Sequence, residues 1–175
     1  MKKLAYLFIL GLLVAQCAKN DNVILSAEGL DANIDKKICV EGIIVHICGV
    51  NGNKMKLMLA DSTMVMVVPE QQIDSFSRQQ WKQKQLRICG MLHGTKLTKQ
   101  YLDSMYNAQQ LLCSIDYKQC TDTAWVSYQW REGNAEKILA SGLIKQEKLM
   151  NKLGLNYIPL FTLTAESIKT IDAAK

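Results

Sequence analysis

Two pairs of residues in this sequence carry side chains that bind metals or act as nucleophiles. His46 and Cys48 lie two positions apart in an apolar, β-branched segment, so a strand there would place both on one face. Cys89 and His93 lie in and just after a second segment of the same kind. If the two segments are neighbouring strands, the four side chains form a Cys2His2 set suited to tetrahedral zinc. The spacing matches no standard zinc motif, and we favour the alternative of two buried thiols and two incidental histidines.

The same residues offer little for covalent catalysis. Cys48 as a nucleophile would need a base, for which His46 is the only nearby candidate, and donors that stabilise an oxyanion. No segment supplies those donors. The sequence also contains no Gly-x-Ser-x-Gly elbow, phosphate-binding loop, Rossmann glycine pattern, His-Glu-x-x-His pair or Cys-x-x-Cys motif. We therefore expect no enzymatic activity and no cofactor.

A second candidate site is a set of lysines and methionines in two adjacent strand-like segments. Its members are Lys54, Lys56, Met58, Met64 and Met66. Lysine can meet a phosphate or an acidic sugar, and methionine adapts to varied apolar surfaces. The alternative places the methionines in a barrel core. Residues 54–68 contain no Phe, Tyr or Trp on which bases could stack, which counts against single-stranded nucleic acid as a ligand.

The N-terminal residues have the composition of a secretion signal. Two lysines precede an uncharged apolar run, residues 4–14. This run is shorter than the roughly 20 residues of a spanning helix and fits the apolar region of a signal peptide. We expect residues 1–17 to be a signal peptide and residues 18–23 a flexible tether. Cys17 stands where a lipoprotein carries its lipid, although Gln16 replaces the usual Gly or Ala, so ordinary cleavage near Cys17 is the alternative.

Charge and length limit the class of protein. The formal charge of +5 falls to +3 when the first two lysines leave with the signal peptide. Such a mild excess differs from the strongly basic face of a nucleic-acid binder. About 155 residues remain, which is enough for one ordinary domain with a single core.

Five cysteines remain after Cys17, and an odd number cannot all pair within one chain. Export makes disulfides permissible. Cys113 and Cys120 are closest in sequence, so a bridge between them is the predicted disulfide. The other three lie in strand-like segments, where a thiol usually behaves as a small buried hydrophobe.

The order of expected elements indicates a barrel. A short helix is expected in residues 24–35, with Ser26 as its N-cap. Strands are expected at residues 37–47, 54–59 and 64–68, a helix at 70–81, a strand at 86–92, a turn at 93–95 and a strand-to-helix segment at 97–106. Three strands, a helix and two strands is the order of the OB-fold, a five-stranded partly open barrel. The predicted class is therefore mainly β with added helices.

The remaining residues are expected to form an addition to the barrel. We assign residues 24–112 to the OB-fold barrel with its N-terminal helix. Residues 113–175 are then a C-terminal helical extension with a closing strand that packs on the barrel. Within it, residues 113–131 look irregular, residues 134–153 form an amphipathic helix, and residues 157–165 form a strand that Pro159 places at an edge.

The sequence resembles a family of exported OB-fold proteins common in Bacteroidota, distantly similar to the tRNA-anticodon type of OB domain. The resemblance covers most of the chain beyond the signal peptide. It rests on residues 33–42, 45–48 and 52–55, Phe76, Tyr101-Leu102 and residues 157–167. It implies the OB-fold and an envelope location, without a defined activity.

These observations predict a noncatalytic OB-fold binding or assembly module of the bacterial cell envelope. Its expected partner is another envelope protein or a glycan, and its membrane contact is a lipid anchor only. One alternative is a metal-binding or thiol-active protein that uses His46, Cys48, Cys89 and His93. Another is oligonucleotide or glycan binding on the barrel face. The location predicted is the periplasmic side or the cell surface.

Overall fold

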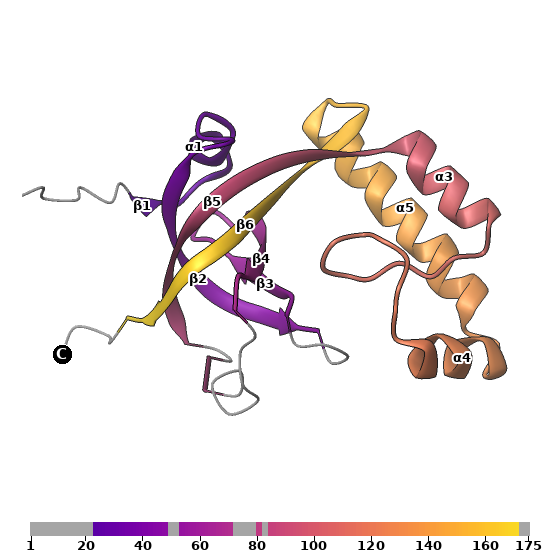
Figure 1. Ribbon diagram of the computed structural model, residues 1–175. Coiled ribbons are helices and arrows are strands. Elements are labelled where there is room, and N and C mark those ends of the chain that lie inside the picture. Colours follow the sequence, from indigo (N-terminus) through magenta and orange to yellow (C-terminus); the bar gives the residue numbers. More distant parts are fainter. Residues whose placement is uncertain (1–22, 49–52, 72–79, 82–83, 172–175) are drawn as a thin grey trace, which may run out of the picture.

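The protein is a closed five-stranded β-barrel with a sixth strand on the outside and a helical insertion at one end (Figure 1). The computed structural model describes residues 23–48, 53–71, 80–81 and 84–171. The strands are β1 (Val23–Ile24), β2 (Lys37–Ile47), β3 (Met55–Met58), β4 (Met64–Pro69), β5 (Gln85–Thr98) and β6 (Tyr157–Thr170). The helices are α1 (Ala27–Asp31), α3 (Lys99–Asn107), α4 (Thr123–Arg131) and α5 (Ala135–Leu153).

The strand order is that of an OB-fold, as predicted. The order β1-β2-β3-β4-β6-β5 is closed by antiparallel pairing between β2 and β5, with β1 left outside. The pairs β2–β3, β3–β4 and β5–β6 are antiparallel, whereas β4 and β6 run parallel. This closure satisfies the backbone groups that a three-stranded meander would leave at its edges.

Alternation of apolar and polar residues produces the barrel wall. In β3, Met55 and Leu57 are fully buried while their neighbours Lys56 and Met58 face outward, half-buried. The inward side chains form one core with Leu30 of α1. Most of this core is completely excluded from solvent, as expected for a small barrel whose interior is filled by side chains.

Two glycines allow the strands to approach at the barrel's corners. Gly42 lies where β2 passes from pairing with β5 to pairing with β3, and a Cβ there would be 2.4 Å from the carbonyl oxygen of Met58. Gly90 lies at the bulge between β5 and β6, where a Cβ would be 1.9 Å from the carbonyl oxygen of Thr164. Any side chain at either position would push backbone apart.

The fourth and fifth barrel strands differ from those predicted. The turn expected at residues 93–95 is wrong, because β5 runs through this segment without a break. Gly94 is needed for packing: a Cβ there would be 2.5 Å from Cδ1 of Ile34. The fifth barrel strand is β6, bonded to both β4 and β5, and not the segment after residue 97, most of which forms α3. Pro159 lies outside the β4 pairing, so the predicted edge position holds locally.

The helix expected between the third and fourth strands lies largely outside the described residues. Residues 72–79, with Phe76 of the resemblance among them, are not described. Residues 80–81 are helical, and Trp81 packs against the barrel core. The predicted signal peptide, the lipidation site Cys17 and residues 18–22 of the tether also lie outside the described ranges.

The helices α3, α4 and α5 form the helical insertion between β5 and β6. The predicted C-terminal helix is confirmed as α5, and Gly154 ends it with a φ of 66°. The prediction of irregular structure before it is wrong in part, because Thr123–Arg131 forms α4, whose N-cap Asp122 accepts a hydrogen bond from the Trp125 backbone. This helix buries no residue completely, which explains the missing apolar pattern. No helix in the described ranges is long and apolar enough to cross a membrane.

Candidate binding cleft

A cleft of about 290 Å³ lies where the end of the β2–β3 hairpin meets the helical insertion. The barrel supplies His46, Cys48 and Lys54. The insertion supplies the remaining lining residues, which are Leu112, Cys113, Ser114, Gln119, Cys120, Thr121, Asp122 and Trp125. In an OB-fold the outer face of the second and third strands and the adjoining loops form the usual ligand site. Strands β2 and β3 are the first two barrel strands here, so the cleft borders that region.

The barrel side of the cleft is fixed by the strand ends. The Cys48 backbone N–H donates to the carbonyl oxygen of Lys54 at 2.9 Å, extending the β2–β3 pairing past both strand ends. A register shift between Ile44 and His46 turns His46 outward, where its side chain is exposed. The sequence pattern placed Lys54 correctly among the outward residues, but an unbroken alternation would put His46 on the buried face of Ile44, and the register shift reverses this.

The opposite side is a tight hairpin, residues 111–120. Leu112 and Gln119 form its single β-bridge, and the Cys113 backbone N–H donates to Lys118 at 2.8 Å. Tyr117 takes a positive φ of 57° at the turn, and its carbonyl oxygen accepts a hydrogen bond from the Tyr101 hydroxyl at 3.1 Å. The hairpin is therefore anchored to α3 while it faces the barrel.

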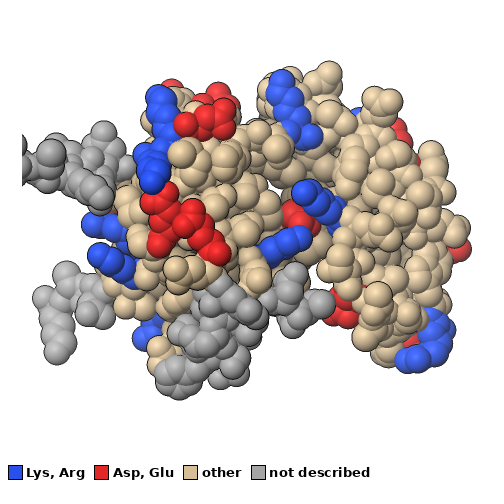
Figure 2. Space-filling model, in the orientation of Figure 1, with Lys and Arg blue, Asp and Glu red and all other residues tan. Residues whose placement is uncertain are grey.

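Two lysines, Lys56 in β3 and Lys54 just before it, connect the 111–120 hairpin to the barrel. Lys54 forms an ion pair with Asp116, whose side chain is 2% exposed. Lys56 donates to the carbonyl oxygen of Ser114, and its ammonium lies 5.3 Å from the centre of the Tyr117 ring. Figure 2 shows basic and acidic side chains together beside the hollow between the barrel and the helical insertion. These contacts place both walls of the cleft.

The Lys54–Asp116 pair has shifted pKa values. The hydrogen bond to Asp116 raises the pKa of Lys54, with burial acting against it. Burial alone would raise the pKa of Asp116, but the hydrogen bonds from Lys54 and from the Lys118 backbone outweigh it and lower this pKa. Both groups are therefore charged at neutral pH, and the pair holds its geometry there.

Three unbridged thiols line the cleft. Among the described cysteines Cys48, Cys113 and Cys120 are unbridged and half-buried. Burial raises the pKa of Cys113, so it is a neutral thiol at pH 7. The predicted Cys113–Cys120 disulfide is wrong: Cys113 lies opposite Lys118 and Cys120 opposite Leu111, so the two are offset along the hairpin.

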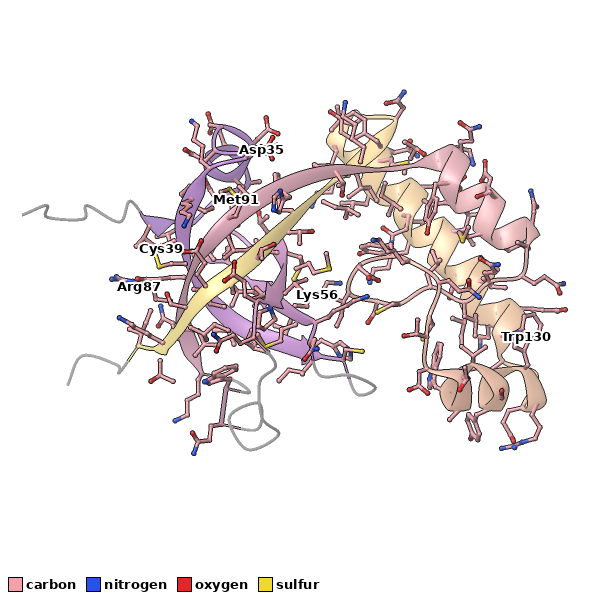
Figure 3. The ribbon with its side chains drawn as sticks, viewed as in Figure 1. Asp35, Cys39, Lys56, Arg87, Met91 and Trp130 are labelled. Atoms are coloured by element: carbon pink, nitrogen blue, oxygen red, sulfur yellow. A yellow bond between two sulfur atoms is a disulfide. The ribbon has the colours of Figure 1, made fainter. Side chains whose placement is uncertain are left out.

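The disulfide in the structure joins Cys39 of β2 to Cys89 of β5. The two residues are direct partners in the antiparallel register that closes the barrel. Figure 3 places Cys39 and Arg87 on the side of the barrel away from the helices, and Lys56 on the side that faces them. The interpretation of Cys39 and Cys89 as buried free thiols is therefore wrong.

The predicted Cys2His2 metal set does not come together. Cys89 is bonded to Cys39, and His46 lies seven residues further along β2, roughly 23 Å of strand length at about 3.3 Å per residue. His93 lies near Asp35, with Nδ1 and Oδ1 3.5 Å apart, and pairs in register with Thr162. Within the described ranges no group of three His, Cys, Asp or Glu side chains could hold a metal ion.

The predicted lysine and methionine face divides into two parts. Lys54 and Lys56 hold the insertion, as described above. Met58, Met64 and Met66 lie on the outside of the barrel and not in its core, because the alternate positions Leu57, Val65 and Val67 fill the interior. Met58 and Met64 pair directly across β3 and β4. The alternative that these methionines form the barrel core is thus wrong.

Sequence reasoning missed Asp116 and Trp125 as site residues. Both lie in the segment that shows no apolar period, so neither helix nor strand logic placed them. An aspartate between the apolar residues Ile115 and Tyr117 was the one signal of a buried, paired carboxylate. Trp125 lines the cleft from α4.

The protein is an OB-type barrel with a helical insertion between β5 and β6, its fourth and fifth barrel strands. The insertion lies against the end of the β2–β3 hairpin and forms the cleft with it. No protein-family model matches the chain, and no curated protein is detectably similar to it in sequence. The cleft itself must therefore carry the functional argument.

Proposed function

We propose that this protein is an exported, noncatalytic OB-fold binding module of the bacterial envelope whose cleft binds a glycan. The observation that carries the proposal is the lining of the cleft, which combines one indole, that of Trp125, with several polar side chains. His46, Lys54, Gln119, Thr121 and Asp122 contribute an imidazole, an ammonium, an amide, a hydroxyl and a carboxylate. A sugar ring offers an apolar face for the indole and hydroxyls for the polar groups, so the two surfaces are complementary.

Other features support export and disfavour the alternatives. A disulfide at directly opposed strand positions suits an oxidising compartment. The signal-like N-terminus and Cys17 favour a lipid anchor. A single tryptophan is a poor platform for several stacked bases, so an oligosaccharide fits the cleft better than an oligonucleotide.

The decisive experiment is a binding screen against envelope oligosaccharides, including muropeptide and acidic capsular fragments, followed by titration calorimetry. We expect one saturable site that weakens at least tenfold in Trp125→Ala and stays unchanged in Trp130→Ala. Trp130 is the matched control because it lies on the same helix but does not line the cleft. Equal loss in both variants, or no saturable glycan, would remove the proposal.

The anchor is tested separately. Labelled palmitate should enter the wild-type chain in cells and not the Cys17→Ser variant, which should be secreted or periplasmic. Label in the variant would assign the lipid to another cysteine, and an unlabelled wild type would favour ordinary cleavage.

A further inference from the structure

A second pocket, of about 210 Å³, lies inside the helical insertion. Its walls are apolar side chains from α3, the hairpin and α5, namely Leu102, Met105, Leu111, Ile138, Leu139 and Leu143. The barrel contributes a single residue, Lys56, and α5 contributes Lys145. The pocket therefore combines an apolar interior with two cationic groups.

The helix α5 leaves part of its apolar stripe uncovered at this pocket. It is 19 residues long and completely buries only Ala135, Gln146 and Met150. Ile138, Leu139 and Leu143 are half-buried and border the pocket. An amphipathic helix normally packs such a stripe against a core, so an apolar ligand would complete this surface.

Neither lysine has a carboxylate partner among the described residues, and the hydrogen bond that Lys56 donates goes to the neutral carbonyl oxygen of Ser114. No ion pair among the described residues involves Lys56 or Lys145. Both lysines line the same pocket, where burial lowers the pKa of Lys56 and the positive charge of Lys145 lowers this pKa further. A bound anion would relieve this repulsion and supply the missing partner.

We propose that the pocket binds the chain of a single-chain anionic amphiphile, a medium-chain fatty acid, with its carboxylate between Lys56 and Lys145. The volume is below the roughly 300–1,000 Å³ of pockets that enclose drug-sized ligands, which excludes two-chain lipids. This site does not depend on the proposed glycan cleft, although the hairpin residues Leu112, Cys113 and Ser114 border both.

Gly142 provides the means to block the pocket. It lines the pocket from α5, and a Cβ built there meets no atom within 4 Å. Alanine therefore fits without displacing anything, whereas an indole would fill the space. Gly142→Ala and Gly142→Trp form a matched pair that differs in how much of the pocket is occupied.

The test is calorimetric titration of the full chain with decanoate, below its micelle concentration. We expect one site, a loss of at least tenfold in Gly142→Trp, and no change in Gly142→Ala. Lys145→Gln should weaken decanoate about fivefold and leave decanol unaffected, while Lys148→Gln, on the same helix outside the pocket, should change neither. Decyl phosphate has the same chain with a phosphate head group. If it binds more tightly than decanoate, the natural ligand is a single-chain phosphate amphiphile instead of a fatty acid.

Several outcomes would overturn the inference. These are absence of saturable decanoate binding, binding unchanged in Gly142→Trp, or equal affinity for decanoate and decanol. If Gly142→Trp fails to fold, which circular dichroism would show, the Lys145→Gln comparison with the two ligands decides the question alone. If Lys148→Gln weakened decanoate as much as Lys145→Gln, the effect would come from the net charge of the protein and not from a contact in the pocket, which would contradict the inference.

Discussion

The barrel and the helical insertion differ in how completely their apolar side chains are buried. Among the residues that the structure describes, fifteen buried ones form the barrel core, most with no solvent exposure, whereas the core at the insertion has four, namely Leu97, Leu102, Met150 and Ile158. In the barrel every second residue of a strand enters one closed interior. In the insertion α3 and α5 contribute one buried residue each to a small cluster at the ends of β5 and β6, and α4 has no buried residue.

The difference shows where this protein keeps space for ligands. The barrel interior is filled, so binding there would require strands to separate. Both pockets considered above border the insertion, where apolar and polar side chains meet without complete packing. The rigid part therefore positions the site, and the loosely packed part forms its wall.

The largest expected effect comes from comparing equal truncations in the two cores. Leu57→Ala in the barrel should lower the free energy of unfolding by about 4 kcal/mol, and Leu102→Ala in the insertion by about 2 kcal/mol. Leu102 already borders a pocket, so its removal opens less new cavity. Urea unfolding measures both; equal losses would mean that the two cores are equally tight.

Removing the disulfide should act on the barrel alone. The double variant Cys39→Ala/Cys89→Ala opens a link across 50 residues and should cost about 3 kcal/mol. Thermal unfolding of the wild type should shift on reduction, and that of the variant should not. Cys113→Ser is the control, and we expect its melting temperature to respond to reductant as the wild type does.

The Lys54–Asp116 pair should link the two regions in a pH-dependent way. Asp116→Asn should lower the free energy of unfolding by about 2 kcal/mol at pH 7, since a charged group in a part-buried hydrogen bond is lost. The pKa of Asp116 lies below its usual 3.8, so the contribution is present above that pH and is lost as pH falls through the lower folded value. Lys54 has a raised pKa, so its contribution is present below 10.5 and lost as pH rises beyond it.

Urea unfolding at pH 7 and at pH 2.5 checks this window. The difference between wild type and Asp116→Asn should shrink at the lower pH. Arg87→Gln is the control, because its pair with Glu41 lies on the barrel surface and should contribute no more than about 1 kcal/mol. A difference that persists unchanged at pH 2.5 would show that the Asp116 charge is not responsible.

The smallest effect should come from two glycines of the same helix. Gly142→Ala should stabilise α5 by up to about 1 kcal/mol, because glycine is a poor helix former and the added methyl meets nothing. Gly154→Ala should destabilise it by a similar amount, since Gly154 needs a φ of 66°. Thermal unfolding should move in opposite directions; a shift of the same sign in both would contradict the assigned roles.

Local patterns in the sequence predicted most elements of the barrel. Alternation indicated β2, β3 and β4, Ser26 capped α1 as expected, and Gly154 ended α5. The position of β6 between β4 and β5 could not be predicted from local patterns, because it depends on parallel pairing with β4 across nearly a hundred residues. Gly94 carried a turn-like signal although its role is to make room for Ile34.

The candidate site was predicted only on its barrel side. His46, Cys48 and Lys54 belong to the end of the β2–β3 hairpin, so their place follows from the predicted strands, although the outward face of His46 depends on a register shift that the pattern does not reveal. Asp116 and Trp125 come from a hairpin and a helix whose placement depends on the long β5–β6 pair. The disulfide required the β2–β5 register, which sequence proximity does not reveal.

The late position of β6 also governs when the protein can fold. Strand β4 gains its second neighbour only from residues 161–165, and β5 gains its outer partner from residues 157–170. In a ribosome-bound chain that lacks this segment, β4 and β5 each have one unpaired edge. The barrel therefore cannot close until residues 157–170 have been made, and the synthesis of the whole helical insertion separates the pairing of β2, β3 and β4 from that closure, an interval in which a chaperone can hold the open chain.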